Sequence, residues 1–226
     1  MSRFRYRRRQ GANTPALPRN TVLHGDCIEV LATLPAASVD LVLTDPPYLC
    51  NYRDRSGRRV ANDNNPAWVA PAFAAIARVL KPGRLCVSFY GWQHAEVFLA
   101  AWRAAGLTPV GHLVFPKPYA SSRRLIASRH EQAYVLAKGP SQVEGPALPD
   151  VLPWAYTGNR LHPTQKPLEA LTPIINAFSQ PGQLVLDPFA GSGSTLAAAK
   201  AAGREFLGIE LDAGHAATAY HRLIHD

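Results

Sequence analysis

Short apolar runs alternate with helical segments along most of the chain, and this alternation restricts the folds that the chain can adopt. The runs in DLVLTDPPY (40–48) and QLVLDPFAG (183–191) are typical of strands that are covered on both faces. The expected strands are the start of TVLHGDCIEV (21–30) and the segments 40–48, 84–91, 107–115, 132–139, 183–191 and 204–212. The expected helices are 28–34, 67–80, 94–106, 165–180, 193–203 and 213–226. This order predicts an α/β fold with a doubly wound, mostly parallel sheet.

The length of the chain suits one hydrophobic core. Its 226 residues are 47% hydrophobic, which places it in the size range of a single domain. Lys81-Pro82-Gly83 is expected to end the second helix, and no internal repeat is visible. We expect a flexible arm at 1–20 and one domain at 21–226.

The first twenty residues are strongly basic. The chain has 24 Lys and Arg residues and 16 Asp and Glu residues, a net charge of +8. Six of the cations precede residue 21, where there is no acid: Arg3, Arg5, Arg7, Arg8, Arg9 and Arg19. The rest of the chain therefore carries only about +2. Such an arm is commonly a solubilising tail or a targeting patch, and it also suits the binding of a polyanion through its phosphates.

Secretion, membrane insertion and metal binding are disfavoured by the sequence. Pro15, Pro18 and polar residues stand where a signal peptide would need an apolar stretch. No apolar run approaches the roughly 18 residues that span a bilayer. Cys27, Cys50 and Cys86 are far apart and form no CxxC pair that would suggest zinc or a redox couple. These features predict a cytoplasmic protein with reduced thiols, no membrane segment and no metal.

Polar or glycine-rich clusters follow four of the expected strands. They are HGDC after Leu23, DPPY after Thr44, DPFAGSG after Leu186, and the Glu210 end of FLGIE. In open α/β sheets, ligands bind beyond the carboxyl ends of the strands. Four such strand ends in one sheet predict a single site.

The segment DPFAGSGST (187–195) connects a strand to a helix, where a glycine-rich turn lets the backbone approach a ligand. Most turns of this kind are only tight connections. The P-loop pattern is absent, and Leu196 stands where the dinucleotide fingerprint needs its third glycine. Glu210, at the end of the next strand, is placed to bind the hydroxyls of a ribose. The segment therefore favours a nucleoside ligand without a pyrophosphate.

The turn DPPY (45–48) offers groups that fit the exocyclic amino group of a nucleobase. The nitrogen of that group is a poor nucleophile because its lone pair is delocalised into the ring. The Asp45 carboxylate and the Pro46 carbonyl can each accept one of its N–H groups, and the two prolines, Pro46 and Pro47, fix the turn. Tyr48 can stack on the base, a contact worth roughly 1–3 kcal/mol in single-strand binders. Without the other strand ends, DPPY would be interpreted as an ordinary turn.

Three motifs in this order resemble those of the beta class of amino-group DNA methyltransferases, which use S-adenosylmethionine. They are Asp45-Pro46-Pro47-Tyr48, then the HPTxKP segment at 162–167, then Phe189-Ala190-Gly191-Ser192-Gly193. The resemblance runs from about Val22 to the end and leaves out the arm and residues 117–159, which are expected to be a short target-recognition insert. It implies a Rossmann-like, S-adenosylmethionine-dependent methyltransferase fold with a circularly permuted motif order, in which both ends of the core lie together.

The resemblance also implies roles for individual residues. The catalytic turn would be Asp45, Pro46, Pro47 and Tyr48. The residues that would bind S-adenosylmethionine are Asp187, Phe189, Gly191 and Gly193 at its methionine end, Thr164 and Lys166 at its carboxylate, Glu210 at its ribose, and Asp26 with Cys27 at its adenine. Taken singly, Lys166 would be interpreted as a surface lysine and Asp26 as a helix cap. His24 and His162 are expected to be structural, because this transfer needs no histidine base.

DNA contacts are expected from arginines on either side of this site. They are Arg53, Arg55, Arg58 and Arg59 in the loop after DPPY, and Arg123 and Arg124 in the insert. The alternative for that loop is a solvated surface segment. Because the target nitrogen lies inside double-stranded DNA, we predict base flipping into a pocket around Tyr48. Leu49 stands where family members often carry Asn or Gly and is given no role. Family members often dimerise, so a homodimer is consistent with the resemblance.

The predicted function is site-specific methylation of adenine N6 in DNA, because the adenine enzymes of the family mostly carry DPPY. Cytosine N4 is the near alternative. RNA or protein amide methyltransferases share this turn but usually place the cofactor motif first. A catalytically idle DNA-binding relative is the third interpretation, and the intact motifs argue against it.

Overall fold

The computed structural model describes residues 16–53, 61–123, 125–141, 145–155 and 165–225. Its main sheet has seven strands in the order β1-β9-β8-β2-β3-β7-β4. They are β1 (Thr21–His24), β2 (Val39–Thr44), β3 (Leu80–Phe89), β4 (Thr108–Pro116), β7 (His130–Ala137), β8 (Leu184–Asp187) and β9 (Glu205–Glu210). Only β7 runs against the others in this sheet. The predicted doubly wound, mostly parallel α/β sheet is confirmed.

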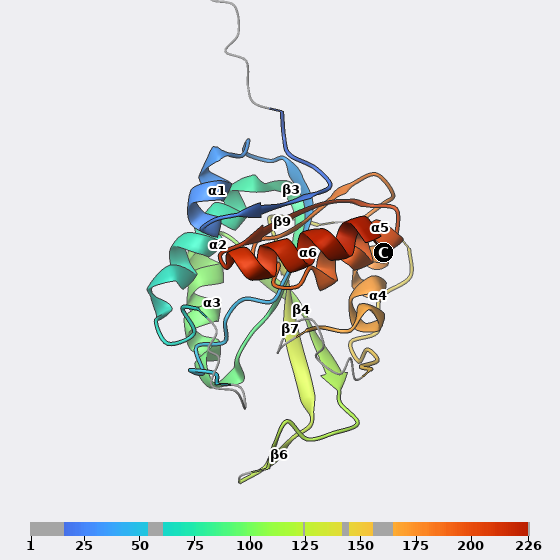
Figure 1. Ribbon diagram of the computed structural model, residues 1–226. Coiled ribbons are helices and arrows are strands. Elements are labelled where there is room, and N and C mark those ends of the chain that lie inside the picture. Colours follow the sequence, from blue (N-terminus) through green and yellow to red (C-terminus); the bar gives the residue numbers. More distant parts are fainter. Residues whose placement is uncertain (1–15, 54–60, 124, 142–144, 156–164, 226) are drawn as a thin grey trace, which may run out of the picture.

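Two layers of helices cover the sheet, one on each face (Figure 1). One layer is α1 (Cys27–Thr33), α2 (Val69–Val79) and α3 (Ala95–Ala104); the other is α4 (Leu168–Phe178), α5 (Ser194–Ala201) and α6 (Ala213–His225). Side chains alternate across β2 to supply both cores: Val42 belongs to the core that contains Phe73 of α2, whereas Leu41 and Leu43 belong to the core that contains Ile174 of α4. The continuous apolar run of β2 is therefore explained by burial on both faces.

The two ends of the domain lie side by side. β1 pairs in parallel with β9, with Leu23 opposite Ile209 and His24 opposite Glu210. This adjacency confirms the expectation drawn from the motif order. It brings HGDC to the same sheet edge as the Glu210 strand end.

The segment between β4 and β7 projects from the body at the sheet edge where β4 ends (Figure 1). It is called the arm from here on and is distinct from the basic residues 1–20. Because β7 is antiparallel to both β3 and β4, the carboxyl end of β4 lies at the same edge as those of β2 and β3. At the end of the arm, β5 (Ser122–Arg123) and β6 (Ala127–Ser128) pair in a small sheet of their own. The sequence patterns had not separated these two short strands.

One predicted boundary was wrong. Lys81-Pro82-Gly83 was expected to end a helix before a strand at residue 84, but these residues belong to β3, which begins at Leu80. The Gly83 amide donates to the Lys138 carbonyl, and Leu80 pairs with Val39, so tertiary pairing overrides the local breaker signal. Within the described residues, no helix has the length and apolar character that a membrane span requires.

Candidate active site

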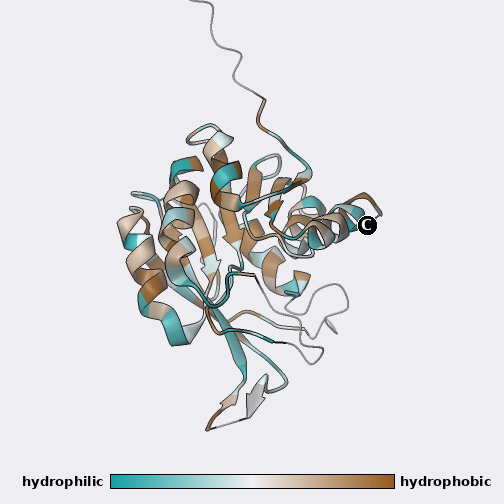
Figure 2. Cartoon of the chain, turned by 60° about the vertical axis from the view of Figure 1, so that its left-hand side comes forward, coloured by the Kyte–Doolittle hydropathy of each residue, from teal (hydrophilic) through white to brown (hydrophobic). Residues whose placement is uncertain are grey.

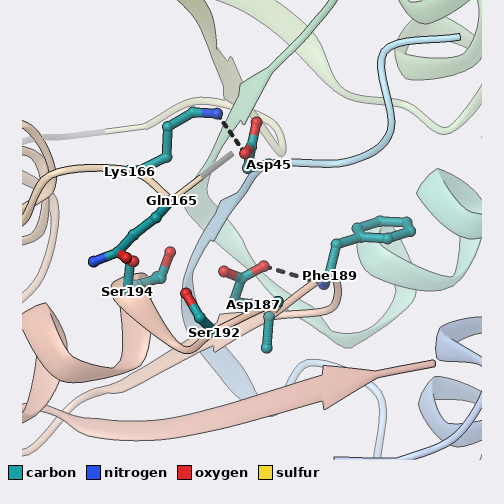
Figure 3. Close-up of a pocket in the computed structure, with 10 residues that line it drawn as sticks. Asp45, Gln165, Lys166, Asp187, Phe189, Ser192 and Ser194 are labelled. Atoms are coloured by element: carbon teal, nitrogen blue, oxygen red, sulfur yellow. Dashed lines mark hydrogen bonds and ion pairs between the residues drawn. The ribbon is translucent and has the colours of Figure 1, made fainter. Parts of the chain in front are cut away.

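The carboxyl ends of β2 and β8 meet at the centre of the sheet. Val42 of β2 pairs with Leu186 of β8, and the Thr44 hydroxyl donates to Asp187 Oδ1 at 2.9 Å. Asp45 and Asp187 therefore lie next to each other, although 142 positions separate them in the chain. Figure 3 shows both carboxylates at one pocket. The pocket is lined by Asp45, Gln165, Lys166, Asp187, Phe189, Ala190, Gly191, Ser192, Ser194 and Thr195.

The glycine-rich turn forms the floor of this pocket. Gly191 and Gly193 have φ angles of 52° and 77°, in the left-handed region that favours glycine. Gly193 precedes the first residue of α5, and the Gly191 amide donates to Glu210 Oε2 at 2.8 Å. The turn thus joins the pocket to the end of β9.

Asp187 is fully buried beneath this turn, and burial raises its pKa to about 7. Its Oδ1 atom accepts hydrogen bonds from Thr44 and from the Phe189 amide, at 2.9 and 3.1 Å. These donors lower the pKa but do not outweigh the loss of hydration. A cation placed beside Asp187 would therefore favour the charged carboxylate.

One oxygen of the Asp45 carboxylate is hydrogen-bonded, and the other is open in the sense that no described group donates a hydrogen bond to it. Its Oδ2 atom is paired with Lys166 Nζ, as Figure 3 shows. Its Oδ1 atom is shielded from solvent and accepts no hydrogen bond from the part of the chain that the structure describes. Burial raises the pKa of Asp45, and the charge of Lys166 opposes that rise. A buried acceptor without a donor is unusual in a native fold and marks a place where a ligand's N–H fits.

Tyr48 is held by a carboxylate that the sequence analysis did not identify. The Tyr48 hydroxyl donates to Glu131 Oε2 at 3.2 Å, and Lys117 Nζ donates to Glu131 Oε1 at 2.6 Å. Burial raises the pKa of Glu131, but the charges of Lys166 and Lys117 outweigh it and lower the pKa below its usual value. Burial and the nearby carboxylates, Asp45 first, raise the pKa of Tyr48. Glu131 is therefore the charged acceptor that positions this ring.

Lys166 lies beside the Asp45 carboxylate and the rings of Tyr48 and Phe89. Besides its pairing with Asp45, its Nζ atom is 5.3 Å from the centroid of the Tyr48 ring and 5.0 Å from that of Phe89. The motif resemblance implies that Lys166, with Thr164, binds the carboxylate of the cofactor. Thr164 lies outside the described residues. In this structure the lysine is instead paired with the Asp45 carboxylate, and its assignment to the cofactor stays a prediction.

The second end of the predicted cofactor site lies at β1 and β9. Asp26 Oδ1 accepts from the Ile28 amide at 2.7 Å and caps α1, while the Gly25 amide donates to the Glu210 carbonyl at 2.9 Å. Burial, with a smaller effect of the Asp26 charge, raises the pKa of Cys27 to about 12. Asp26, Cys27 and Glu210 are thus brought together as the strand order implied. Their contact with a cofactor stays a prediction.

An aromatic side chain that the sequence analysis missed stands beside Phe189. The ring centroids of Trp68 and Phe189 are 5.2 Å apart, in an edge-to-face arrangement. Trp68 belongs to the 3₁₀ turn Pro66–Trp68 that follows the polar loop. Only its position at the end of that loop could have drawn attention to it.

The predicted DNA contacts are described only in part. Arg53 is exposed, and Arg123 belongs to β5 at the end of the arm. Arg55, Arg58, Arg59 and Arg124 lie outside the described residues. Within the described residues, no group of three or more His, Cys, Asp or Glu side chains could hold a metal ion.

Leu49, directly after Tyr48, is a departure from the family pattern, and the backbone conformation at this position accounts for the usual Asn or Gly. Its φ angle is 63°, in the left-handed region, and its side chain is buried in the core beneath α1 to α3. Asn and Gly adopt this backbone conformation more readily than Leu. The position therefore needs a backbone geometry, and here burial of the Leu side chain offsets the strain.

Comparisons with known proteins agree with this geometry. The family model described as DNA methylase matches residues 145–221. The Escherichia coli protein "Putative methylase YubD" is 53% identical, over 84% of this chain and 83% of its own length. The E. coli DNA adenine methyltransferase YhdJ is 30% identical, over 90% of this chain and 82% of its own.

Solved structures share the fold. TTHA0409 of Thermus thermophilus, in complex with S-adenosyl-L-methionine, is 26% identical with a TM-score of 0.69, covering 90% of this chain and 92% of that one. The cytosine-N4-specific PvuII DNA methyltransferase is 17% identical with a TM-score of 0.73, covering 91% of this chain and 86% of that one. The long matches to YubD and YhdJ show that the chain belongs to the family of amino-group DNA methyltransferases.

Proposed function

We propose that this protein transfers a methyl group from S-adenosylmethionine to N6 of adenine in double-stranded DNA, after the target base has rotated out of the duplex. The open Oδ1 atom of Asp45 carries this proposal, because it is a buried acceptor at the sheet edge that an exocyclic N–H would satisfy. Two further features support the choice of adenine. The turn begins with Asp45, as in most adenine enzymes of the family, and the relative YhdJ is named a DNA adenine methyltransferase.

The described residues fit S-adenosylmethionine along the sheet edge. Asp187 is a buried carboxylate that a ligand ammonium group would stabilise in its charged form. Glu210 accepts one backbone N–H on each oxygen, from Gly191 and Asp212, which fixes its orientation and leaves lone pairs for ribose hydroxyls. When bound, S-adenosylmethionine supplies an electrophilic methyl group on a sulfonium sulfur.

The chain's own residues would prepare the base for the transfer. Asp45 Oδ1 would accept one N–H of the amino group and the Pro46 carbonyl the other, which draws the nitrogen lone pair out of conjugation with the ring. The charge of Lys166 favours the charged form of Asp45, and the pKa of this carboxylate, which burial raises, makes it a better proton acceptor than an exposed aspartate. Oδ1 would take up the proton that the nitrogen loses on methylation, while the sulfur of the bound S-adenosylmethionine would keep the electron pair of its broken bond to the methyl carbon. These effects are orientation and fixed electrostatics.

Tyr48 would stack on the flipped base. Its hydroxyl is held by Glu131, and Lys166 lies over its ring, so the plane of the ring is fixed before a base enters. Arg53, Arg55, Arg58 and Arg59 would hold the strand backbone, with Arg123 and Arg124 on the arm. A homodimer would double this DNA-binding surface.

The test is a methyl-transfer assay with labelled S-adenosylmethionine, followed by mass analysis of the nucleosides from unmethylated DNA. We expect N6-methyladenine with the natural protein and none with Asp45→Ala. N4-methylcytosine would overturn the choice of base. Transfer to RNA alone, or no transfer to any nucleic acid, would overturn the proposed function.

A further inference from the structure

The arm between β4 and β7 ends in two large apolar side chains that nothing covers in the described part of the chain. β5 and β6 pair with Ser122 opposite Ser128 and Arg123 opposite Ala127, and the connection between them carries Leu125 and Ile126. Leu125 is 98% exposed and Ile126 is 67% exposed. In Figure 2 the brown end of the arm contrasts with the teal strand that leads to it.

Single exposed apolar residues are common on protein surfaces, but this pair has a distinct setting. The two side chains are adjacent, stand at the end of a projecting ribbon and have a far larger exposed fraction than the core side chains. From 118 to 130 the chain has no acid and carries Arg123, Arg124 and Arg129. The end of the arm is apolar, and the charged residues beside it are all basic. This combination is complementary to DNA, which has a negatively charged backbone and an apolar stack of bases.

The root of the arm is fastened to the catalytic turn. The Lys117 amide donates to the Arg129 carbonyl at 2.7 Å, which closes the base of the ribbon. The buried Lys117 side chain then contacts Glu131, and Glu131 accepts from Tyr48. The arm therefore leaves the body directly beside the ring that is proposed to stack on the flipped base.

We propose that this arm enters a groove of the DNA and that Leu125 and Ile126 wedge into the base stack beside the target base. The inference rests on the proposed function. A two-stranded ribbon fits the major groove, which is about 12 Å wide. Apolar side chains that are inserted between base steps separate the stack, and basic residues on the flanks neutralise phosphates. Such a wedge would fill the place that the flipped base leaves and favour the open state.

The test compares a wedge variant with a matched control on two substrates. The wedge variant is Leu125→Ser with Ile126→Ser. The control is Val110→Ser with Ile224→Ser, which removes two other exposed apolar side chains, 56% and 55% exposed, far from the end of the arm. One duplex carries the methylated site, as mapped by sequencing DNA from cells that express the protein. The other has the same site with a mismatched base opposite the target.

On the paired duplex, the wedge variant should lose roughly 10- to 100-fold in kcat/KM, the order expected for the unstacking that it no longer supports. On the mismatched duplex, where the target is already unpaired, it should return to within about 3-fold of the natural protein. The control should match the natural protein on both. Equal loss on both duplexes, or no loss on either, would overturn the wedge.

A fluorescence measurement separates this inference from the proposed function. With 2-aminopurine beside the target base and no cofactor, binding of the natural protein should raise the fluorescence, and binding of the wedge variant should not. That result with no methyl transfer would keep the wedge and reject the proposed function. If methyl transfer occurs and the wedge variant raises the fluorescence as much as the natural protein does, the proposed function would stand and the wedge would be rejected. A change from dimer to monomer in the wedge variant, with equal loss on both duplexes, would identify an interface with a second copy and overturn the wedge.

Discussion

Replacement of Glu131 by glutamine tests whether a buried charge network positions Tyr48. The Lys117 side chain is 2% exposed and that of Glu131 22%, and their charged atoms are 2.6 Å apart. Gln keeps one acceptor oxygen, but its second terminal atom is an amide nitrogen that cannot accept a hydrogen bond from the Tyr48 hydroxyl or from Lys117. It also leaves the lysine cation without a counter-charge. Removal of one partner from a buried pair typically costs about 3–5 kcal/mol. The partial exposure of Glu131 places our expectation near the lower end, at about 3 kcal/mol.

A second substitution isolates the charge effect. Lys117→Met retains the volume of the stem without the cation, so the double variant with Glu131→Gln should regain about 2 kcal/mol of the lost stability. The free energy of unfolding from urea titrations, with an unchanged m value, is the readout. The rate of methyl transfer should be low in Glu131→Gln and should stay low in the double variant, because Tyr48 lacks its charged acceptor in both. Tyr48→Phe should show a similar loss of transfer.

Two results would refute this reasoning. One is a Glu131→Gln variant whose free energy of unfolding lies within about 0.5 kcal/mol of that of the natural protein, the range of ordinary surface substitutions. The other is additive destabilisation by the two substitutions, since a true pair must show coupling.

Three further predictions follow from the same site. A Cβ at Gly91 would lie 2.5 Å from the Tyr48 carbonyl oxygen, so Gly91→Ala should displace the DPPY turn and abolish transfer, whereas Gly111→Ala, with its nearest neighbour at 3.5 Å, should stay active in the same assay. The raised pKa of Asp187, about 7, means that the folded state holds more protons than the unfolded state between about pH 4 and 7. The free energy of unfolding should therefore fall across that range, by up to about 4 kcal/mol, and Asp187→Asn should flatten the fall in urea titrations without cofactor. Lys166→Met removes the charge that opposes the raised pKa of Asp45, so the acid limb of kcat against pH should move to higher pH, and an unmoved limb would contradict the pairing.

The parts of the fold that were predicted correctly depend on local pattern. Apolar runs that end in polar clusters located the strands and their carboxyl ends, and parallel pairing then brings those ends to one edge. Asp45 and Asp187 could be placed together for this reason alone. The order of the motifs also implied that β1 lies beside β9.

The parts that were missed depend on register and on long-range side-chain contacts. Glu131 is 83 positions from Tyr48 and reaches it only because β7 lies between β3 and β4 with Pro116 opposite His130. Lys166 is 121 positions from Asp45, so no local pattern indicates their pairing. The exposed end of the arm depends on the two-residue strands β5 and β6, which are too short to show a period.

Single-turnover transfer by Asp45→Asn is the most direct measurement of the central claim. Asn keeps the shape of the side chain and removes the charge that holds the amino group and accepts its proton. With binding of S-adenosylmethionine and DNA within about 3-fold of the natural protein, the transfer rate should fall by roughly 10²- to 10³-fold, the loss typical of a removed electrostatic contact in the transition state. A rate within about 3-fold of the natural protein under the same conditions would contradict the claim that Asp45 activates the exocyclic amino group.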